Sequence, residues 1–215
     1  MNPATVRRPW RQVVVMARWP ARGRCKSRLG AGIGLAAAAR IQRRLSEHTL
    51  AAARPLGRRE HQPGWGTELV LAVGGLGPRG ARRWGQSLGA DRAVLQGGGG
   101  LGSRMVRQLA RACREGARQV LLIGTDLPLL ATADLESAFA AFASRSLVLG
   151  PASDGGYWLI GLTGPQPGLF SGIPWGSADV LRLTLERAQQ LGLEPVLLAQ
   201  RQDLDRPGDL EPWLG

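Results

Sequence analysis

The chain has 215 residues, of which 44% are hydrophobic, and its formal net charge is +12. A chain of this size can bury a sizeable core, so we expect one domain spanning residues 1–215. Its apolar runs are far shorter than the roughly 20 residues of a membrane span, and the first is too brief for a signal peptide. Only two cysteines are present, at no metal-ligand spacing. We therefore expect a cytoplasmic protein without a membrane span, disulfide framework or zinc site.

Strands and helices alternate along the chain, which predicts an α/β fold with a largely parallel sheet. Glycine- and proline-rich loops are expected at 54–67, 74–80 and 97–100. The hydrophobic pattern predicts, in chain order, a strand at 11–16, a helix at 35–53, a strand at 68–73, a helix at 79–88, a strand at 93–95, a helix from 101, a strand at 119–123, a helix at 134–142, strands at 146–149 and 157–162, a helix at 178–191, a strand at 195–198 and a short helix after 207.

The positive charge is compatible with nucleic acid, an anionic membrane surface or a small acidic substrate as a partner. In the helix expected from residue 101, the arginines fall away from the apolar positions, as in a solvated amphipathic helix. No basic patch is interleaved with aromatic residues, which argues against nucleic acid. A non-catalytic polyanion-binding protein stays open as an alternative class. All but one of the 28 basic residues are arginine, and the exception is Lys26.

Glycine-rich turns in an α/β sheet also raise the possibility of a dinucleotide-binding enzyme. Two G-x-G-x-x-G matches begin at Gly75 and Gly97, each between a plausible strand and a helix. With 31 glycines in the chain such matches arise readily by chance. Neither match follows the first strand, where a dinucleotide fold carries it, so we disfavour a nicotinamide or flavin enzyme.

A basic loop, ARWPARGRCKSRLG at 17–30, follows the first expected strand. Its glycines give a phosphate access to backbone N–H groups, and Arg22, Arg24, Lys26 and Arg28 supply fixed cations. This predicts a site for a phosphate-bearing substrate. A solvated basic turn is the alternative, and the sequence of a Walker loop is absent.

Two acidic segments are candidates for a metal site. The strand in VLLIGTDLP ends at Gly124, which places Asp126 in the crevice beyond the carboxyl ends of the strands. A carboxylate there can hold Mg²⁺ or Mn²⁺, which in turn neutralises a diphosphate. DLDRPGDL, near the end of the chain, supplies Asp203, Asp205 and Asp209, one of which could complete the site. The alternatives are a turn or capping aspartate at Asp126 and surface acids before a short helix.

Six segments in a fixed order resemble a bacterial family of glycosyltransferases with the GT-A nucleotide-diphospho-sugar transferase fold. Members are often named arsenosugar-biosynthesis glycosyltransferases, and small guanylyltransferases share the fold. The resemblance covers roughly 13–210 and implies a three-layer α/β sandwich, a nucleotide-sugar donor, a small-molecule acceptor and a divalent cation. The segments are MARWPARGRCKSRLG, QGGGGLGSRM, LIGTDLP, GPASDGGYWLIGL, LFSGIPWGSADVL and DLDRPGDL.

The resemblance also implies roles for individual residues. Gly23, Lys26 and Arg28 would bind donor phosphate, and Gln96 and Gly102 would lie beside the base. In the same way, Asp126 and Asp205 would hold the metal ion. The chain departs from the family pattern at Gly176, Arg206 and Gly208, which leaves the acceptor side less defined.

The segment DGGY, at 154–157, interrupts two stretches that are typical of buried strands. The resemblance places it beside the donor, where Gly155 and Gly156 would let a ligand approach the backbone. Asp154 would then address a sugar, an acceptor hydroxyl or the metal. A β-hairpin turn with Asp-Gly at its corner is the alternative, and both can hold together.

The expected function is transfer of a sugar from a nucleotide sugar to a small acceptor, with Asp154 and Asp126 as catalytic residues. The alternative on the same fold is nucleotidyl transfer, in which a phosphate oxygen attacks a nucleoside triphosphate and pyrophosphate leaves. Release of a nucleoside diphosphate marks the first reaction, and release of pyrophosphate marks the second.

Overall fold

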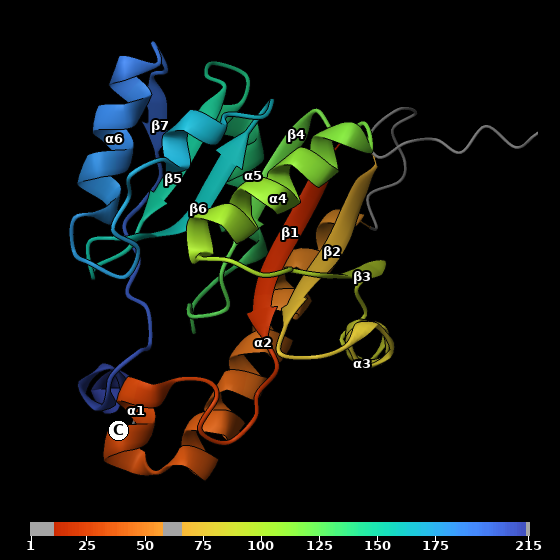
Figure 1. Cartoon of the computed structure of the whole chain (residues 1–215), viewed down its shortest axis with the longest axis vertical. Helices are drawn as coiled ribbons and strands as arrows, with labels where there is room; N and C mark the ends of the chain where they lie inside the picture. The colour runs from red at the N-terminus through yellow and green to blue at the C-terminus, as the bar shows by residue number, and fades with distance from the viewer. Residues whose placement is uncertain (1–10, 58–65, 214–215) are drawn as a thin grey trace, which may run out of the picture.

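The computed structural model describes residues 11–57 and 66–213. These residues form seven strands, six α-helices and two 3₁₀ helices (Figure 1). The strands are β1 (Arg11–Arg18), β2 (Thr67–Gly74), β3 (Arg92–Leu95), β4 (Gln119–Ile123), β5 (Leu147–Pro151), β6 (Tyr157–Leu162) and β7 (Pro195–Leu197). The helices are α1 (Ser27–Ile33), α2 (Leu35–Gly57), α3 (Pro78–Ser87), α4 (Leu101–Arg114), α5 (Thr132–Ala141) and α6 (Val180–Gln190), with η1 (Pro167–Phe170) and η2 (Pro207–Trp213).

All seven strands belong to one sheet with the order β3-β2-β1-β4-β6-β5-β7. Strand β6 runs antiparallel to β4 and β5, whereas the pairs β1–β2, β1–β4, β2–β3 and β5–β7 are parallel. In the centre, Val13 of β1 pairs with Leu69 of β2 and with Leu121 of β4, and all three are buried. Such continuous apolar strands are typical of a sheet covered on both faces. The predicted mostly parallel sheet is confirmed.

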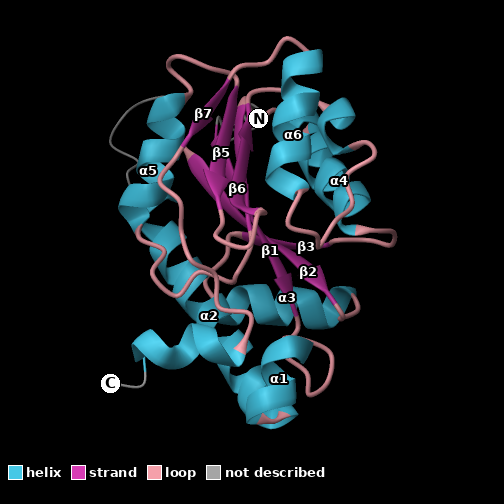
Figure 2. Cartoon of the chain, turned by 90° about the vertical axis from the view of Figure 1, so that its left-hand side faces the viewer, coloured by secondary structure: helices cyan, strands magenta, loops and turns pink. Residues whose placement is uncertain are grey.

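Helices cover both faces of the sheet, as Figure 2 shows edge-on. Val13 and Val15 point to the face covered by α2, α3 and α5, where they join Leu50, Trp84 and Leu135. Val14 points to the opposite face, which α4, α6 and η1 cover. The alternation of side chains along a strand produces this separation into two cores. The molecule is thus a three-layer α/β sandwich, as predicted.

A third, smaller core joins α1 and α2 to the C-terminal segment that precedes η2. Leu29 of α1 is buried against Ala38 and Leu45 of α2, together with Leu204 from the last segment. Figure 1 shows α1 beside the C-terminal residues, below the arrowheads of β1 and β2. This core holds the basic loop and the second acidic segment at the carboxyl edge of the parallel strands.

Most predicted elements are present, with three differences. The residues of α1 were expected to belong to the basic loop, and the segment SRLGAGI is short and glycine-rich. In the structure the helix is stabilised by tertiary packing of Leu29. Helix α2 continues through Pro55 to Gly57, beyond its predicted end at residue 53. Of the loop predicted at 54–67, residues 58–65 lie outside the described residues. The closing helix after residue 207 is a 3₁₀ helix. None of the described helices is long and apolar enough to span a bilayer.

Candidate functional site

The basic loop connects β1 to α1 and turns sharply at two residues. Gly23 has a φ of 71°, and Lys26 is the only described non-glycine residue with a positive φ, at 48°. A left-handed lysine is disfavoured by contact between its Cβ and the backbone, so the surrounding contacts must hold it there. Lys26 lies directly before α1 and turns its side chain into the protein, where 3% of it is exposed.

Lys26 joins the three segments that the sequence singled out. Its Nζ donates to Oδ1 of Asp126 at 2.5 Å and to the backbone carbonyl of Leu204. The backbone amide of Leu204 in turn donates to the carbonyl of Asp126 at 2.8 Å. The basic loop, the β4–α5 loop and the last acidic segment are therefore cross-linked at one point. Lys26 was predicted to bind phosphate, and in this structure its ammonium group is occupied by protein partners.

The other charged residues of these segments also pair with one another. Arg28 donates to Oδ2 of Asp205 at 2.8 Å, and both side chains are partly exposed. Asp209 accepts the backbone amides of Asp205 and Arg206, so it shapes the turn before η2. Gln42 of α2, which the sequence did not single out, is buried and donates to the hydroxyl of Thr125 at 2.9 Å. Its only sequence signal is a polar residue on the apolar face of a helix.

Two neighbouring cavities meet at Asp126, whose side chain is 51% exposed. The first, the basic-loop cavity, has a volume of about 520 Å³ and is lined by Arg18, Gly23, Arg24, Cys25, Lys26, Ser27, Gln42, Asp126 and Asp205. The second, the tryptophan cavity, has a volume of about 220 Å³. It is lined by Leu101, Met105, Gly124, Asp126, Leu127, Ala152, Asp154, Gly156, Tyr157, Trp158, Trp175, Gly176, Ser177, Val180 and Asp203.

Trp175 is central to the wall of the tryptophan cavity. Its ring stacks against Phe170 at 6.2 Å between centroids and meets Tyr157 edge-on at 6.3 Å. A Cβ atom on Gly102 would lie 2.5 Å from Nε1 of Trp175, so the absence of a side chain at Gly102 lets α4 approach the indole. Gly102 was expected beside a nucleotide base, but its space is filled by this tryptophan. The aromatic wall was not predicted from the sequence.

Three carboxylates face the same cavity from different segments: Asp126, Asp154 and Asp203. Burial raises the pKa of Asp203, and the nearby charges of Asp154 and Asp126 raise it further. The charges of Asp154 and Asp126 therefore act on Asp203, although the three residues are separated by 28 and 49 positions along the chain. The expected pairing of Asp126 with Asp205 as metal ligands stays a prediction. Asp203 lines the tryptophan cavity, whereas Asp205 lines the basic-loop cavity.

The DGGY segment forms the turn of the β5–β6 hairpin. Asp154 accepts the backbone amide of Gly156 through Oδ1 at 2.8 Å, and Gly155 has a φ of 88°. Asp154 therefore both stabilises the hairpin turn and lines the tryptophan cavity. A Cβ on Gly155 would lie 2.1 Å from the carbonyl oxygen of Ala178, so this glycine makes room for the start of α6 and not for a ligand. Gly156 does line the cavity.

Gln96 has a packing role in place of the expected contact with a base. Its Nε2 donates to the carbonyls of Ala17 and Ala72 at 3.1 and 3.0 Å, which ties the carboxyl ends of β1 and β2 together. Its Oε1 accepts Arg104. Gln96 is buried, and both N–H donors of its amide group are used within the protein.

The fit of a divalent cation can be judged from the donor atoms. Carboxylate oxygens are suitable donors for Mg²⁺ or Mn²⁺, and Asp126 is accessible from both cavities. Among residues 11–57 and 66–213, no group of three or more His, Cys, Asp or Glu is arranged to hold a metal ion. The residues thus fit a cation held by one or two carboxylates, with substrate phosphate and water as its other ligands, which is the usual mode for Mg²⁺.

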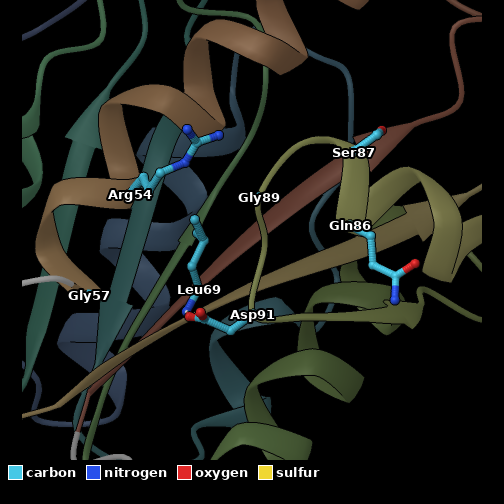
Figure 3. Close-up of a pocket in the computed structure, with 7 residues that line it drawn as sticks. All are labelled: Arg54, Gly57, Leu69, Gln86, Ser87, Gly89 and Asp91. Atoms are coloured by element: carbon cyan, nitrogen blue, oxygen red, sulfur yellow. The ribbon is translucent and has the colours of Figure 1, made fainter.

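A larger hollow of about 660 Å³ lies at the opposite, amino ends of β2 and β3 (Figure 3). Its two charged residues are tied to backbone groups. Arg54 donates to the carbonyl of Leu88, and Asp91 accepts the amide of Leu69. None of the site residues expected from the sequence lines this hollow.

The chain resembles known proteins both in sequence and in structure. A family model described as an uncharacterized protein conserved in bacteria (DUF2064) matches residues 60–177. A search among curated proteins finds no match. The chain is similar to a solved structure from Desulfovibrio desulfuricans G20, described as a candidate nucleotide-diphospho-sugar transferase. The TM-score is 0.79 and the identity 28%, over 94% of this chain and 85% of that chain.

Two more distant structures share the fold. One is CMP:2-keto-3-deoxy-manno-octonic acid synthetase complexed with CTP, with a TM-score of 0.56 and 12% identity over 94% of this chain and 96% of that one. The other is glucosyl-3-phosphoglycerate synthase from Mycobacterium tuberculosis with Mn²⁺, UDP and glucosyl-3-phosphoglycerate. Its TM-score is 0.56 and its identity 16%, over 94% of this chain and 74% of that one. These matches support the GT-A-like fold.

Proposed function

Because this chain belongs to the bacterial family DUF2064 and shares the fold of nucleotide-diphospho-sugar transferases, we propose that it transfers a sugar from a nucleotide-sugar donor to a small acceptor. The observation that carries the proposal is the meeting of two unlike cavities at Asp126. One is bordered by the cations of the basic loop, and the other by aromatic rings and carboxylates. A diphosphate in the first would place its sugar at the entrance of the second.

The donor diphosphate would lie in the basic-loop cavity. Arg18 and Arg24 line this cavity, and Gly23 leaves the loop backbone open on the same side. Arg28 is held by Asp205 in the free protein, and a phosphate would compete for its guanidinium group. Lys26 would act indirectly, because it fixes Asp126 where the two cavities meet.

A divalent cation, Mg²⁺ or Mn²⁺, would be held by Asp126 and Asp205, which both line the basic-loop cavity. When bound, it would neutralise charge on the departing diphosphate. Asp205 would become available when phosphate takes its place on Arg28. The metal dependence draws support from the Mn²⁺ complex of the Mycobacterium tuberculosis structure and from the donor set described above.

The transfer step would take place at the mouth of the tryptophan cavity. The acceptor oxygen forms a bond to the anomeric carbon of the sugar, and the bond from that carbon to the diphosphate oxygen breaks. The nucleoside diphosphate leaves, and the acceptor proton passes to a carboxylate. Asp154 would receive it, and this role is supported by the hydrogen bond from the Gly156 amide, which holds the carboxylate at the cavity wall.

Nucleotidyl transfer is the second candidate, since the synthetase complexed with CTP shares the fold. In that reaction an acceptor oxygen attacks the α-phosphorus of a nucleoside triphosphate and pyrophosphate leaves.

We also propose that residues 1–215 act as a single domain and that the protein works in the cytoplasm.

A thermal-shift panel would test the function directly. Nucleoside diphosphates and triphosphates would be compared with and without Mn²⁺, and the products of nucleotide-sugar turnover would then be analysed. Stabilisation by a nucleoside diphosphate and its release from a nucleotide sugar would support glycosyl transfer. Pyrophosphate release from a triphosphate would support the second candidate. Absence of any nucleotide-dependent shift would contradict both.

A further inference from the structure

The tryptophan cavity has a charge opposite to that of the whole chain. The chain carries a formal charge of +12, yet the charged residues that line this cavity are Asp126, Asp154 and Asp203. No Arg, Lys or His of the described residues lines it. Within the same part of the chain, Asp154 and Asp203 form no ion pair with a basic side chain. The basic-loop cavity next to it is bordered by Arg18, Arg24 and Lys26.

Lys26, the cation paired with Asp126, does not cancel the charge of the other two carboxylates. Lys26 is already bound to Asp126 and to the Leu204 carbonyl, and 3% of its side chain is exposed. Asp126 is therefore paired with a cation, whereas Asp154 and Asp203 form no ion pair among the described residues. An anionic group entering the cavity would meet the charges of Asp154 and Asp203, which have no basic partner in an ion pair. Asp203 is partly buried, so its repulsion is screened less by solvent than that of the exposed Asp154.

The walls between the carboxylates are apolar. Trp158 is buried, Tyr157 and Trp175 meet edge-on, and Leu101 and Met105 of α4 close the same space. A volume of about 220 Å³ suits a small body packed against these rings. Carboxylates at the edge of an aromatic hollow can accept hydrogen bonds from hydroxyl groups, because an ionised carboxylate is an acceptor only.

We propose that the tryptophan cavity binds the acceptor, and that this acceptor is a small, partly apolar alcohol without a phosphate or carboxylate group. The inference rests on the proposed glycosyl transfer and adds the chemical class of its second substrate. The acceptor hydroxyl donates to a cavity carboxylate, and its body packs on Trp175. Its oxygen bonds to the anomeric carbon, the nucleoside diphosphate departs into the basic-loop cavity, and the proton goes to the carboxylate.

The charge selectivity of the cavity can be measured without knowing either substrate. Ser177 lines the cavity and is partly buried, so Ser177→Cys introduces a thiol at its wall. Cys113 is replaced by alanine, while the buried Cys25 is retained and the protein without Ser177→Cys serves as the blank. The rate of modification by an uncharged methanethiosulfonate is divided by the rate for its sulfonate analogue, in EDTA and without nucleotide. The same ratio for free cysteine is the reference.

We expect the ratio to exceed that of free cysteine by roughly tenfold or more, since the carboxylates repel the sulfonate. Adding Asp154→Asn and Asp203→Asn should bring it back towards the reference. Glu186→Gln removes the same charge on α6, outside the cavity, and should leave the ratio unchanged. A ratio equal to the free-cysteine value, or one that Glu186→Gln lowers as much as the cavity variants do, overturns the inference.

Acceptor screening gives the second test and separates the inference from the function on which it rests. Alcohols and their phosphate esters, such as benzyl alcohol with benzyl phosphate and glycerol with glycerol 3-phosphate, are offered in pairs with nucleotide sugars and Mn²⁺. Transfer to the alcohol at least tenfold above its ester supports the inference. Transfer preferring the ester overturns it while leaving glycosyl transfer standing. Nucleotide-dependent thermal shifts report on the donor site alone.

Discussion

Lys26 combines an unusual backbone conformation with two hydrogen bonds from its buried side chain. It is the only lysine of the chain, it takes a left-handed conformation, and its ammonium group holds both Asp126 and the Leu204 carbonyl. The compact ammonium group of lysine can turn its donors to both acceptors, whereas the planar fork of arginine holds its donors in a fixed geometry. We interpret Lys26 as a residue that positions Asp126.

Replacing Lys26 by methionine should therefore affect stability as well as nucleotide binding. The substitution leaves the Leu204 carbonyl and one oxygen of Asp126 without their donor, at a cost of about 1–3 kcal/mol in the free energy of unfolding. Urea denaturation measures this quantity. Arg28→Met is the matched control, because Arg28 is mostly exposed and its ion pair contributes little. Equal losses of stability in the two variants would contradict a positioning role for Lys26.

Asp126 is the point shared by both cavities, and Asp126→Asn tests it most directly. Asparagine keeps the shape but loses the charge, so Mn²⁺-dependent stabilisation by a nucleoside diphosphate should disappear. In the parent protein, ligand at 100 times its Kd stabilises by about 2.7 kcal/mol, which a thermal shift detects. Asp209→Asn is a suitable control, because Asp209 serves the turn before η2. An unchanged Mn²⁺-dependent shift in Asp126→Asn would remove this residue from the site.

Residue types could be predicted from the sequence more reliably than the partners of each residue. The acids at Asp126 and Asp154 were expected near a ligand, and both do line the tryptophan cavity. Gln96, Gly102 and Gly155 were also expected to face a ligand, but they are used by the protein itself. Their partners are Ala17, Trp175 and Ala178, which lie 79, 73 and 23 positions away. Local patterns contain no information on contacts at that distance.

At the scale of elements, the β5–β6 hairpin and α6 depend on one glycine. Gly155 has a φ of 88°, its carbonyl accepts the amide of Leu181, and a Cβ would lie 2.1 Å from the Ala178 carbonyl oxygen. Alanine there would combine a strained backbone with a collision against another backbone group. Gly155→Ala should therefore destabilise the protein by roughly 2 kcal/mol or more.

Gly156→Ala provides the comparison for that experiment. An added Cβ at Gly156 would meet only the Asp154 carboxylate, at 3.1 Å, and its φ is not in the left-handed region. Thermal unfolding of the two variants should show the larger loss for Gly155→Ala. Equal stability of Gly155→Ala and the parent would mean that the junction between the hairpin and α6 can rearrange at little cost.

The elements themselves were predictable where the hydrophobic period was clear. Strands β4 and β6 have the bounds expected from their apolar runs, because both faces of the sheet are buried. Helix α1 was not, because seven residues with two glycines have little intrinsic helix propensity. It is stabilised by packing of Leu29 against α2 and Leu204, which no local window of sequence reveals.

At the scale of the whole molecule, the site depends on contact between the basic loop near the start of the chain and the acidic segment at 203–209. Lys26, Asp126 and Leu204 are joined by hydrogen bonds although they are separated by 100 and 78 positions. The strand order explains how this is possible, because β1 and β4 are parallel neighbours whose carboxyl ends lie together. The last segment then returns beneath them and packs on α1 (Figure 1).

These contacts predict that donor binding will change the dynamics of the basic loop and of the segment at 203–210 together. A nucleoside diphosphate with Mn²⁺ should slow amide hydrogen exchange in the basic loop and α1 and also at 203–210. Lys26→Met removes the side-chain link, so protection of 203–210 should be lost or greatly reduced. Protection of the basic loop should persist in part, because its arginines still contact phosphate. Hydrogen exchange by mass spectrometry, compared at equal saturation with nucleotide, measures both segments in one sample. If 203–210 shows no change in the parent protein, or the same protection in Lys26→Met, the coupling runs through some route other than Lys26.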